Sequence, residues 1–105
     1  MTDQDWIDLH NARVSEMPPE VLQKAVDFLT SELGPAKTSI LELYNEDPIH
    51  WVAEHHMFWG MQVRNALRGI GLKDDMLPSG NWDDYYVPCV EMAIGVRPIP
   101  GGSPA

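Results

Sequence analysis

The sequence predicts an all-α fold, a compact single domain of four or five helices. Apolar residues recur at helical spacing in several segments of the 105-residue chain, and glycine and proline separate those segments. No segment shows the alternation of apolar and polar residues that is typical of a half-buried strand. We therefore expect one helical domain over residues 1–95 and a flexible tail, rich in proline and glycine, over residues 96–105.

The first two helices have clear start and stop signals. Thr2, followed by acidic residues in the first turn, fits a relaxed capping box and predicts a short helix over about residues 3–12. Two adjacent prolines suit the first turn of the next helix, and Gly34 with Pro35 ends the regular apolar face that follows. These signals predict a second helix over residues 18–33.

Two further helices are expected in the middle of the chain. Apolar residues predict a helix over residues 35–45, which ends before Pro48 because the residue preceding a proline avoids the helical region. The longest helix is expected over residues 49–68, and glycines end it. Its apolar stripe has steps of seven, four, three and four residues: Val52, Trp59, Val63, Ala66 and Ile70.

The last helix contains a proline. Residues 72–81 have the composition of a loop, and Asn81 or a nearby serine can cap a helix over residues 82–94. Pro88 falls inside this helix, and we expect it to kink the axis. The alternative is that residues 82–87 form an ordered turn and that the helix begins at Pro88.

The composition limits the class of partner. Sixteen acidic and seven basic residues give a formal net charge of −9, which repels phosphate backbones and disfavours direct binding of nucleic acid. The charge serves either solubility or docking onto a basic surface of a protein partner. The single cysteine, Cys89, forms no disulfide within the chain. Without a signal-peptide pattern or an apolar run long enough for a bilayer, we expect a soluble cytoplasmic protein.

A polar cluster interrupts the apolar stripe of the longest predicted helix. His56 falls where a core residue is expected, and Gly60 and Arg64 follow on the same helix face. A mid-helix glycine indicates close approach by another group. With acids from the last helix, the predicted cluster comprises His56, Gly60, Arg64, Asn65, Asp83 and Asp84.

Two interpretations of this cluster remain open. In the catalytic one, a hydrolase or transferase uses His56, Arg64 and the Asp83–Asp84 pair on an anionic substrate. In the structural one, which we prefer, Arg64 pairs with Asp83 or Asp84 and joins two helices. We expect Cys89 to be buried and inert.

The same residues carry a family resemblance. The segment His56-x-x-x-Gly60-x-x-Val63-Arg64-Asn65, followed by Asp83-Asp84 and a helix with Glu91, resembles a family of small bacterial and phage proteins of unknown function. Members of that family carry His-x-x-x-Gly-x-x-Ile-Arg-Asn, and His-Pro-Asp-Asp opens their last helix. The match covers about residues 49–94, with Asn81-Trp82 in place of the family's His-Pro. The resemblance implies a helical fold and a shared polar cluster but no activity.

A metal site has little support in the sequence. His50 and Glu54 lie one turn apart on a helix, which is the spacing of two ligands on one face. The neighbouring histidines, His55 and His56, point in other directions, and no second cluster completes the set. We therefore predict no metal and no cofactor, with His50 and Glu54 as the weak alternative.

A second apolar face predicts an interface. Several large residues lie off the main stripe, and one helix cannot bury two faces unless another surface covers the second. That surface is either the N-terminal helix with Trp6 and Ile7 or a partner. The predicted interface residues are Trp51, His55, Phe58, Trp59 and Gln62, with Met61 beside them.

Together these features predict a small acidic module that binds a protein without catalysis. The partner is another protein or a second copy of the chain, with no nucleic acid and no membrane involved. The resemblance to phage proteins suggests a regulatory role, such as inhibition of a host complex. The alternative is the small hydrolase or transferase described above.

Overall fold

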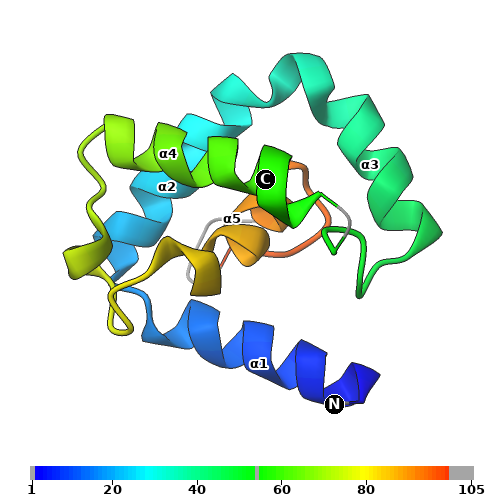
Figure 1. Ribbon diagram of the computed structural model, residues 1–105, viewed down its shortest axis with the longest axis horizontal. Coiled ribbons are helices and arrows are strands. Elements are labelled where there is room, and N and C mark those ends of the chain that lie inside the picture. The colour runs from blue at the N-terminus through cyan, green and yellow to red at the C-terminus, as the bar shows by residue number, and fades with distance from the viewer. Residues whose placement is uncertain (1, 54, 100–105) are drawn as a thin grey trace.

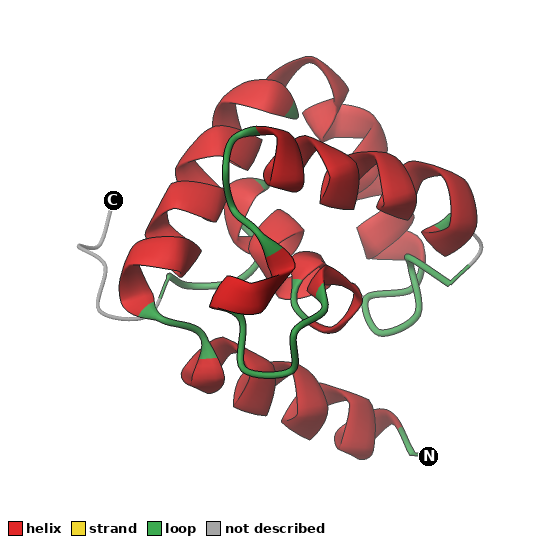
Figure 2. Ribbon diagram, turned by 60° about the vertical axis from the view of Figure 1, so that its left-hand side comes forward, coloured by secondary structure: helices red, strands yellow, loops and turns green. Residues whose placement is uncertain are grey.

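The computed structural model describes residues 2–53 and 55–99, and of His56 only the backbone. Over these residues the chain forms five α-helices and no strand, so the predicted compact all-α fold is confirmed (Figures 1 and 2). None of the described helices is long and apolar enough to cross a membrane.

The core forms between α2 (Pro19–Glu32) and α5 (Tyr86–Ala93) at the centre of the molecule. The helix α4 (Met61–Gly69) lies over them, α3 (Lys37–Glu46) lies to one side, and α1 (Asp3–Glu16) runs along the opposite edge (Figure 1). Almost every side chain of α5 is buried, because this short, apolar helix is surrounded by the others. A polar side chain on α5, such as Glu91, must therefore find its partners inside the core.

The start signals of the first two helices are confirmed. Thr2 and Asp5 form a capping box, with Asp5 N donating to Thr2 Oγ1 at 3.2 Å and Thr2 N donating to Asp5 Oδ2 at 2.9 Å. The helix α2 matches its prediction within a residue at each end. The helix α1 is longer than predicted and continues to Glu16, because no helix breaker precedes Pro18 and Val14 is buried at its end.

The prediction of a long helix over residues 49–68 is wrong. Asp47 Oδ1 accepts hydrogen bonds from the backbone N–H of Ile49 and His50, and residues 50–53 continue as turns. A π-helical turn, His56–Gly60, then leads into α4. An unbroken helix would leave Trp51 off the apolar stripe, whereas the turns bury its side chain in the core.

The preferred kinked helix over residues 82–94 is also wrong. Residues Trp82–Asp84 form a separate 3₁₀ turn capped by Asn81, whose Oδ1 accepts from Asp83 N at 2.9 Å. The helix α5 begins at Tyr86, which places Pro88 in its first turn, where a missing N–H leaves no intrahelical bond unmade. The structure is close to the alternative of a turn followed by a helix.

Part of the predicted tail belongs to the domain. Val96 and Ile99 pack against the core, and Arg97 Nε donates to Glu91 Oε1 at 3.0 Å. The described residues of this segment are therefore held in place, and residues 100–105 lie outside the described part of the chain.

Candidate functional site

Arg64 forms the centre of the predicted polar cluster. It is only 7% exposed, and its Nε lies 2.6 Å from Asp83 Oδ1. Its guanidinium carbon lies 5.1 Å from the ring centroid of the buried Tyr86. Arg64 therefore joins α4 to the 3₁₀ turn that precedes α5, as the structural interpretation predicted.

Gly60 allows this packing. A Cβ atom at Gly60 would overlap the hydroxyl oxygen of Tyr86 and would lie 3.1 Å from Nη1 of Arg64. The Tyr86 ring is fully buried, so it has little room to move away. Burial also raises the pKa of the Tyr86 hydroxyl, and the neighbouring Arg64 partly opposes that shift. The glycine is therefore explained by close approach of a tyrosine, in agreement with the pattern that singled it out.

Two other members of the predicted cluster, Asn65 and Asp84, bind side chains other than Arg64. Asn65 is exposed, and its Oδ1 accepts from Arg68 Nη1 at 2.8 Å. Asp84 Oδ2 accepts instead from Ser79 Oγ at 2.7 Å. The side chain of His56 is outside the described part of the structure. The described geometry thus brings together Gly60, Arg64 and Asp83 but not Asn65 or Asp84.

A second ion pair holds the loop before α5. Arg68 donates to both carboxylate oxygens of Asp74, with distances of 2.6 and 3.0 Å, and Asp74 Oδ2 also accepts from Trp82 N at 3.0 Å. The hydrogen bond from Arg68 lowers the pKa of Asp74. Since Asp74 and Asp83 each pair with an arginine, these carboxylates neutralise cations of the chain itself rather than presenting an open cation site.

A buried network that the sequence did not predict lies on the other side of α5. Glu91 is 4% exposed, and its Oε2 accepts from Trp51 Nε1 at 3.0 Å. Its other oxygen accepts from Arg97 Nε, and Arg97 Nη1 donates to Asn11 Oδ1 at 2.8 Å. The only sequence signal was a charged residue on an otherwise apolar helix. Of its two partners, Trp51 lies forty residues away along the chain, and Arg97 lies six residues away in the segment that was predicted to be a tail.

The predicted interface residues separate into two groups. Trp51 is 5% exposed, so its assignment to an interface is wrong, and Trp59 is half-buried with its ring centroid 5.8 Å from that of Trp51. His55 is half-buried, and Gln62 is exposed. The remaining predicted residue, Phe58, is 79% exposed.

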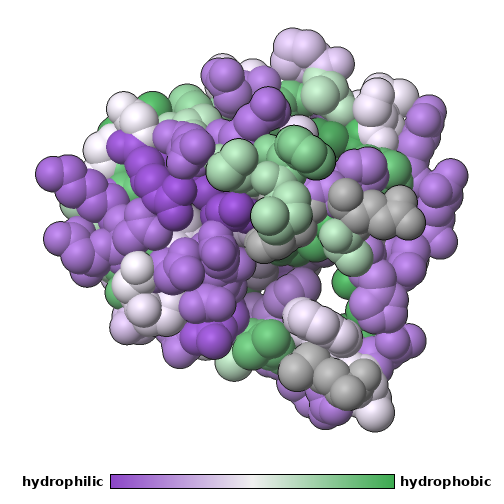
Figure 3. All heavy atoms as spheres, in the orientation of Figure 1, coloured by the Kyte–Doolittle hydropathy of each residue, from purple (hydrophilic) through white to green (hydrophobic). Residues whose placement is uncertain are grey.

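Phe58 belongs to an exposed apolar surface. Met57 and Met61 beside it are 72% and 45% exposed, and we call these three residues the apolar patch. Figure 3 shows apolar surface over the start of α4, with hydrophilic residues around it. The helix α1 does not cover the patch, since its own Trp6 and Ile7 remain 36% and 39% exposed. The alternative in which Trp6 and Ile7 seal this face is therefore wrong.

The described residues do not support the alternative of a metal site at His50 and Glu54. Within the described residues, no group of three or more histidine, cysteine, aspartate or glutamate side chains converges. His50 lies 3.6 Å from Asp3 Oδ1 and 3.4 Å from Asp47 Oδ2, and Glu54 lies outside the described residues. His50 thus bridges α1 to the turn after α3.

Cys89 is not a nucleophile in this fold. Its side chain is fully buried, and its Sγ lies 3.9 Å from the sulfur of Met17. Burial raises the pKa of the thiol to about 12, so the reactive thiolate is absent at neutral pH.

Comparison of the chain with protein-family models, with curated proteins and with solved structures found no match. The resemblance to small bacterial and phage proteins stays a prediction from the motif.

Proposed function

We propose that this chain is a small, acidic, non-catalytic module that binds another protein through the apolar patch. The observation that carries the proposal is the exposure of Phe58, at 79%, beside Met57 at 72%. Aromatic residues and methionine are enriched where protein interfaces are buried, and a few such side chains supply most of the binding energy. An exposed phenylalanine between two exposed methionines has the composition of such a contact.

The backbone beneath the patch is fixed, which favours binding. Trp59 packs against Trp51, and Gly60 packs against the buried Tyr86. Both residues follow Phe58 in the chain, so the π-helical turn that carries Met57 and Phe58 is held by its opposite side. A preorganised contact loses less conformational entropy on binding than a mobile loop.

The charge of the chain indicates the chemistry of the partner. A net charge of −9 repels acidic surfaces and favours a protein with an apolar pocket in basic surroundings. A second copy carries the same charge, which disfavours self-association. The resemblance to phage proteins adds a role, the regulation or inhibition of a host complex in the cytoplasm, which rests on analogy.

The enzyme alternative has less support from the geometry. Arg64, the residue expected to bind an anionic substrate, is 7% exposed and already pairs with Asp83. A substrate anion would have to displace that carboxylate and enter a closed region. Asp84 and Asn65 bind other side chains, so among the described residues these two do not join Arg64 in a substrate site.

The experiment compares two exposed substitutions. Phe58→Ser removes the central side chain of the patch, and Met76→Ser is the matched control because Met76 is 44% exposed on a different segment. Tagged wild-type protein and both variants are used to capture partners from cells, at low and high salt. The proposal predicts a partner that Phe58→Ser loses, that Met76→Ser keeps and that high salt weakens.

Sedimentation of the purified protein provides the second readout. The proposal predicts a monomer in the absence of partner. If the wild type is instead a dimer and Phe58→Ser is a monomer, the patch binds a second copy of the chain and the proposal of a different partner protein is wrong. Capture that is identical for wild type and Phe58→Ser would contradict a role for the patch.

A further inference from the structure

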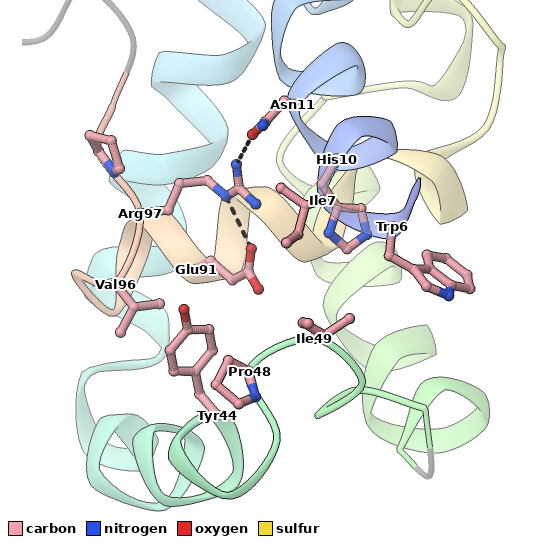
Figure 4. Close-up of a pocket in the computed structure, with 11 residues that line it drawn as sticks. Trp6, Ile7, His10, Asn11, Tyr44, Pro48, Ile49, Glu91, Val96 and Arg97 are labelled. Atoms are coloured by element: carbon pink, nitrogen blue, oxygen red, sulfur yellow. Dashed lines mark hydrogen bonds and ion pairs between the residues drawn. The ribbon is translucent and has the colours of Figure 1, made fainter. Parts of the chain in front are cut away.

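A cavity lies beneath the N-terminal half of α1, away from the apolar patch. It has a volume of about 430 Å³ and is bounded by α1, by the turn after α3 and by the segment after α5 (Figure 4). A second cavity of about 520 Å³ adjoins it and shares the side chains of Trp6, His10 and Ile49. Both volumes fall in the range of small-molecule sites, roughly 300–1,000 Å³.

Polar groups converge on one side of this cavity. Figure 4 shows the Glu91 carboxylate, the Arg97 guanidinium and the His10 ring around the same space, opposite Tyr44, Pro48 and Ile49. Glu91 is 4% exposed, although α5 is otherwise almost wholly apolar. Burying such an ion pair adds little stability compared with well-packed apolar residues, so stability alone does not explain its presence.

The charges of these groups cancel. Glu91 and Arg97 form an ion pair at 3.0 Å. Burial lowers the pKa of His10, which keeps its ring uncharged at neutral pH. The cavity therefore offers no net charge to a phosphate or an ammonium group, and an uncharged ligand fits it best.

Both members of the ion pair can still form hydrogen bonds with a ligand. Over residues 2–53 and 55–99, Nη2 of Arg97 donates to no other group, and the His10 ring makes no hydrogen bond. Each Glu91 oxygen accepts one bond and has a second lone pair. A donor and acceptors thus lie side by side in a cavity whose lining also includes Trp6 and Tyr44.

We propose that this cavity binds an uncharged planar heterocycle whose edge carries a hydrogen-bond acceptor beside a donor, as a nucleobase does. The acceptor would face Arg97 Nη2, and the donor would face Glu91 or His10. The apolar and aromatic walls would cover the faces of the ring. This site is independent of the apolar patch and adds a small-molecule ligand to a protein-binding module.

The test titrates the full chain with adenine, cytosine and uracil at up to millimolar concentrations, and follows the indole N–H signal of Trp6 and the ring signals of His10 by NMR. Indole is the matched probe, since it is planar and of similar size but has no acceptor on its ring edge. The proposal predicts that at least one base shifts both residues in a saturable way, and that indole binds roughly tenfold more weakly or not at all.

Two variants separate binding from folding. Arg97→Lys keeps the charge that pairs with Glu91 but removes the second amino group of the fork, and roughly a tenfold loss of base affinity is expected. Ile7→Trp places a large ring into the cavity wall and should abolish binding, whereas Met76→Trp, on an exposed site elsewhere, should not. Circular dichroism of each variant verifies that it is folded.

The proposal is overturned if none of the three bases shifts the signals of Trp6 and His10. It is equally overturned if indole binds as tightly as the best base, because the polar groups would then have no role. Unchanged base affinity in folded Arg97→Lys or Ile7→Trp would place the ligand somewhere else and would also overturn it.

Discussion

Two faces of one short segment have opposite roles. On one face, Gly60 and Arg64 pack against Tyr86 and Asp83, and Arg64 is 7% exposed. On the other face, Phe58 is 79% exposed and makes no comparable contact with the core. The difference shows that one short segment combines an inward face that packs in the core with an outward face that stays exposed, which is where the proposed partner would bind.

The largest expected loss of stability is that of Arg64→Ala, which removes the central contact of the inward face. Its loss removes a buried side chain that packs on Tyr86 and pairs with Asp83, whose own side chain is 42% exposed, so we expect a decrease of about 3 kcal/mol in the free energy of unfolding. For a domain of this size the Tm should fall by at least ~12 °C. Thermal unfolding followed by circular dichroism measures this.

The control for Arg64→Ala is Arg68→Ala. The Arg68 side chain is 36% exposed, and its pair with Asp74 is accessible to water, so a loss of about 1 kcal/mol is expected. Equal destabilisation by the two substitutions would show that the burial of Arg64 adds nothing to its contribution to stability.

The next effect is that of Gly60→Ala. The new methyl group meets the Tyr86 hydroxyl, and overpacking of this kind costs about 1–3 kcal/mol, partly offset by the higher helix propensity of alanine. Removing the hydroxyl with Tyr86→Phe should make Gly60→Ala less harmful in the double variant than in the single one. Urea denaturation of the four proteins measures this coupling, and purely additive effects would show that Tyr86 does not explain the glycine.

A pH-dependent effect involves Cys89, which is buried in the core beside Met17. Burial raises the pKa of its thiol from 9.0 to about 12, so the folded state holds the proton more tightly than the unfolded state. The resulting stability is complete below pH 9 and decreases by about 1.4 kcal/mol for each pH unit as the pH rises towards the folded pKa. Cys89→Ala should show a shallower alkaline decline than the wild type in urea denaturation, whatever its stability at neutral pH. Parallel declines would contradict the raised pKa.

The smallest expected effect on stability is that of Phe58→Ser. An exposed side chain with few contacts changes the free energy of unfolding by about 0.5 kcal/mol or less. The Tm of this variant should therefore stay within a few degrees of the wild-type value, while partner capture is lost. A large decrease in Tm would mean that Phe58 supports the fold.

The sequence predicted those features of the structure that depend on residues close together in the chain. The capping box at Thr2 and the end of α2 at Gly34 follow from backbone hydrogen bonds within a few positions. The pairing of Arg64 with Asp83 was predictable because a long cation faced the acidic start of the last helix. Gly60 was recognised as a close-approach position, although its neighbour, Tyr86, was not identified.

Contacts between residues far apart in the chain could not be predicted from the sequence. Trp51 was assigned to an interface because helical spacing placed it off the apolar stripe, whereas turns direct it to Glu91, forty residues away. Arg97 was placed in a mobile tail, but it pairs with Glu91 and Asn11. No periodic pattern carries information about such pairs, because tertiary packing decides whether a helix continues through residues 49–55.

A double-mutant cycle on Arg64 and Asp83 measures whether the inward face of the segment depends on this ion pair. The free energy of unfolding is measured by urea denaturation for the wild type, Arg64→Ala, Asp83→Ala and the double variant. If the inward face depends on this pair, the double variant should lose about 1–3 kcal/mol less than the summed losses of the two single variants. Strictly additive losses would contradict it, because the inward face of the segment would then not depend on this pair.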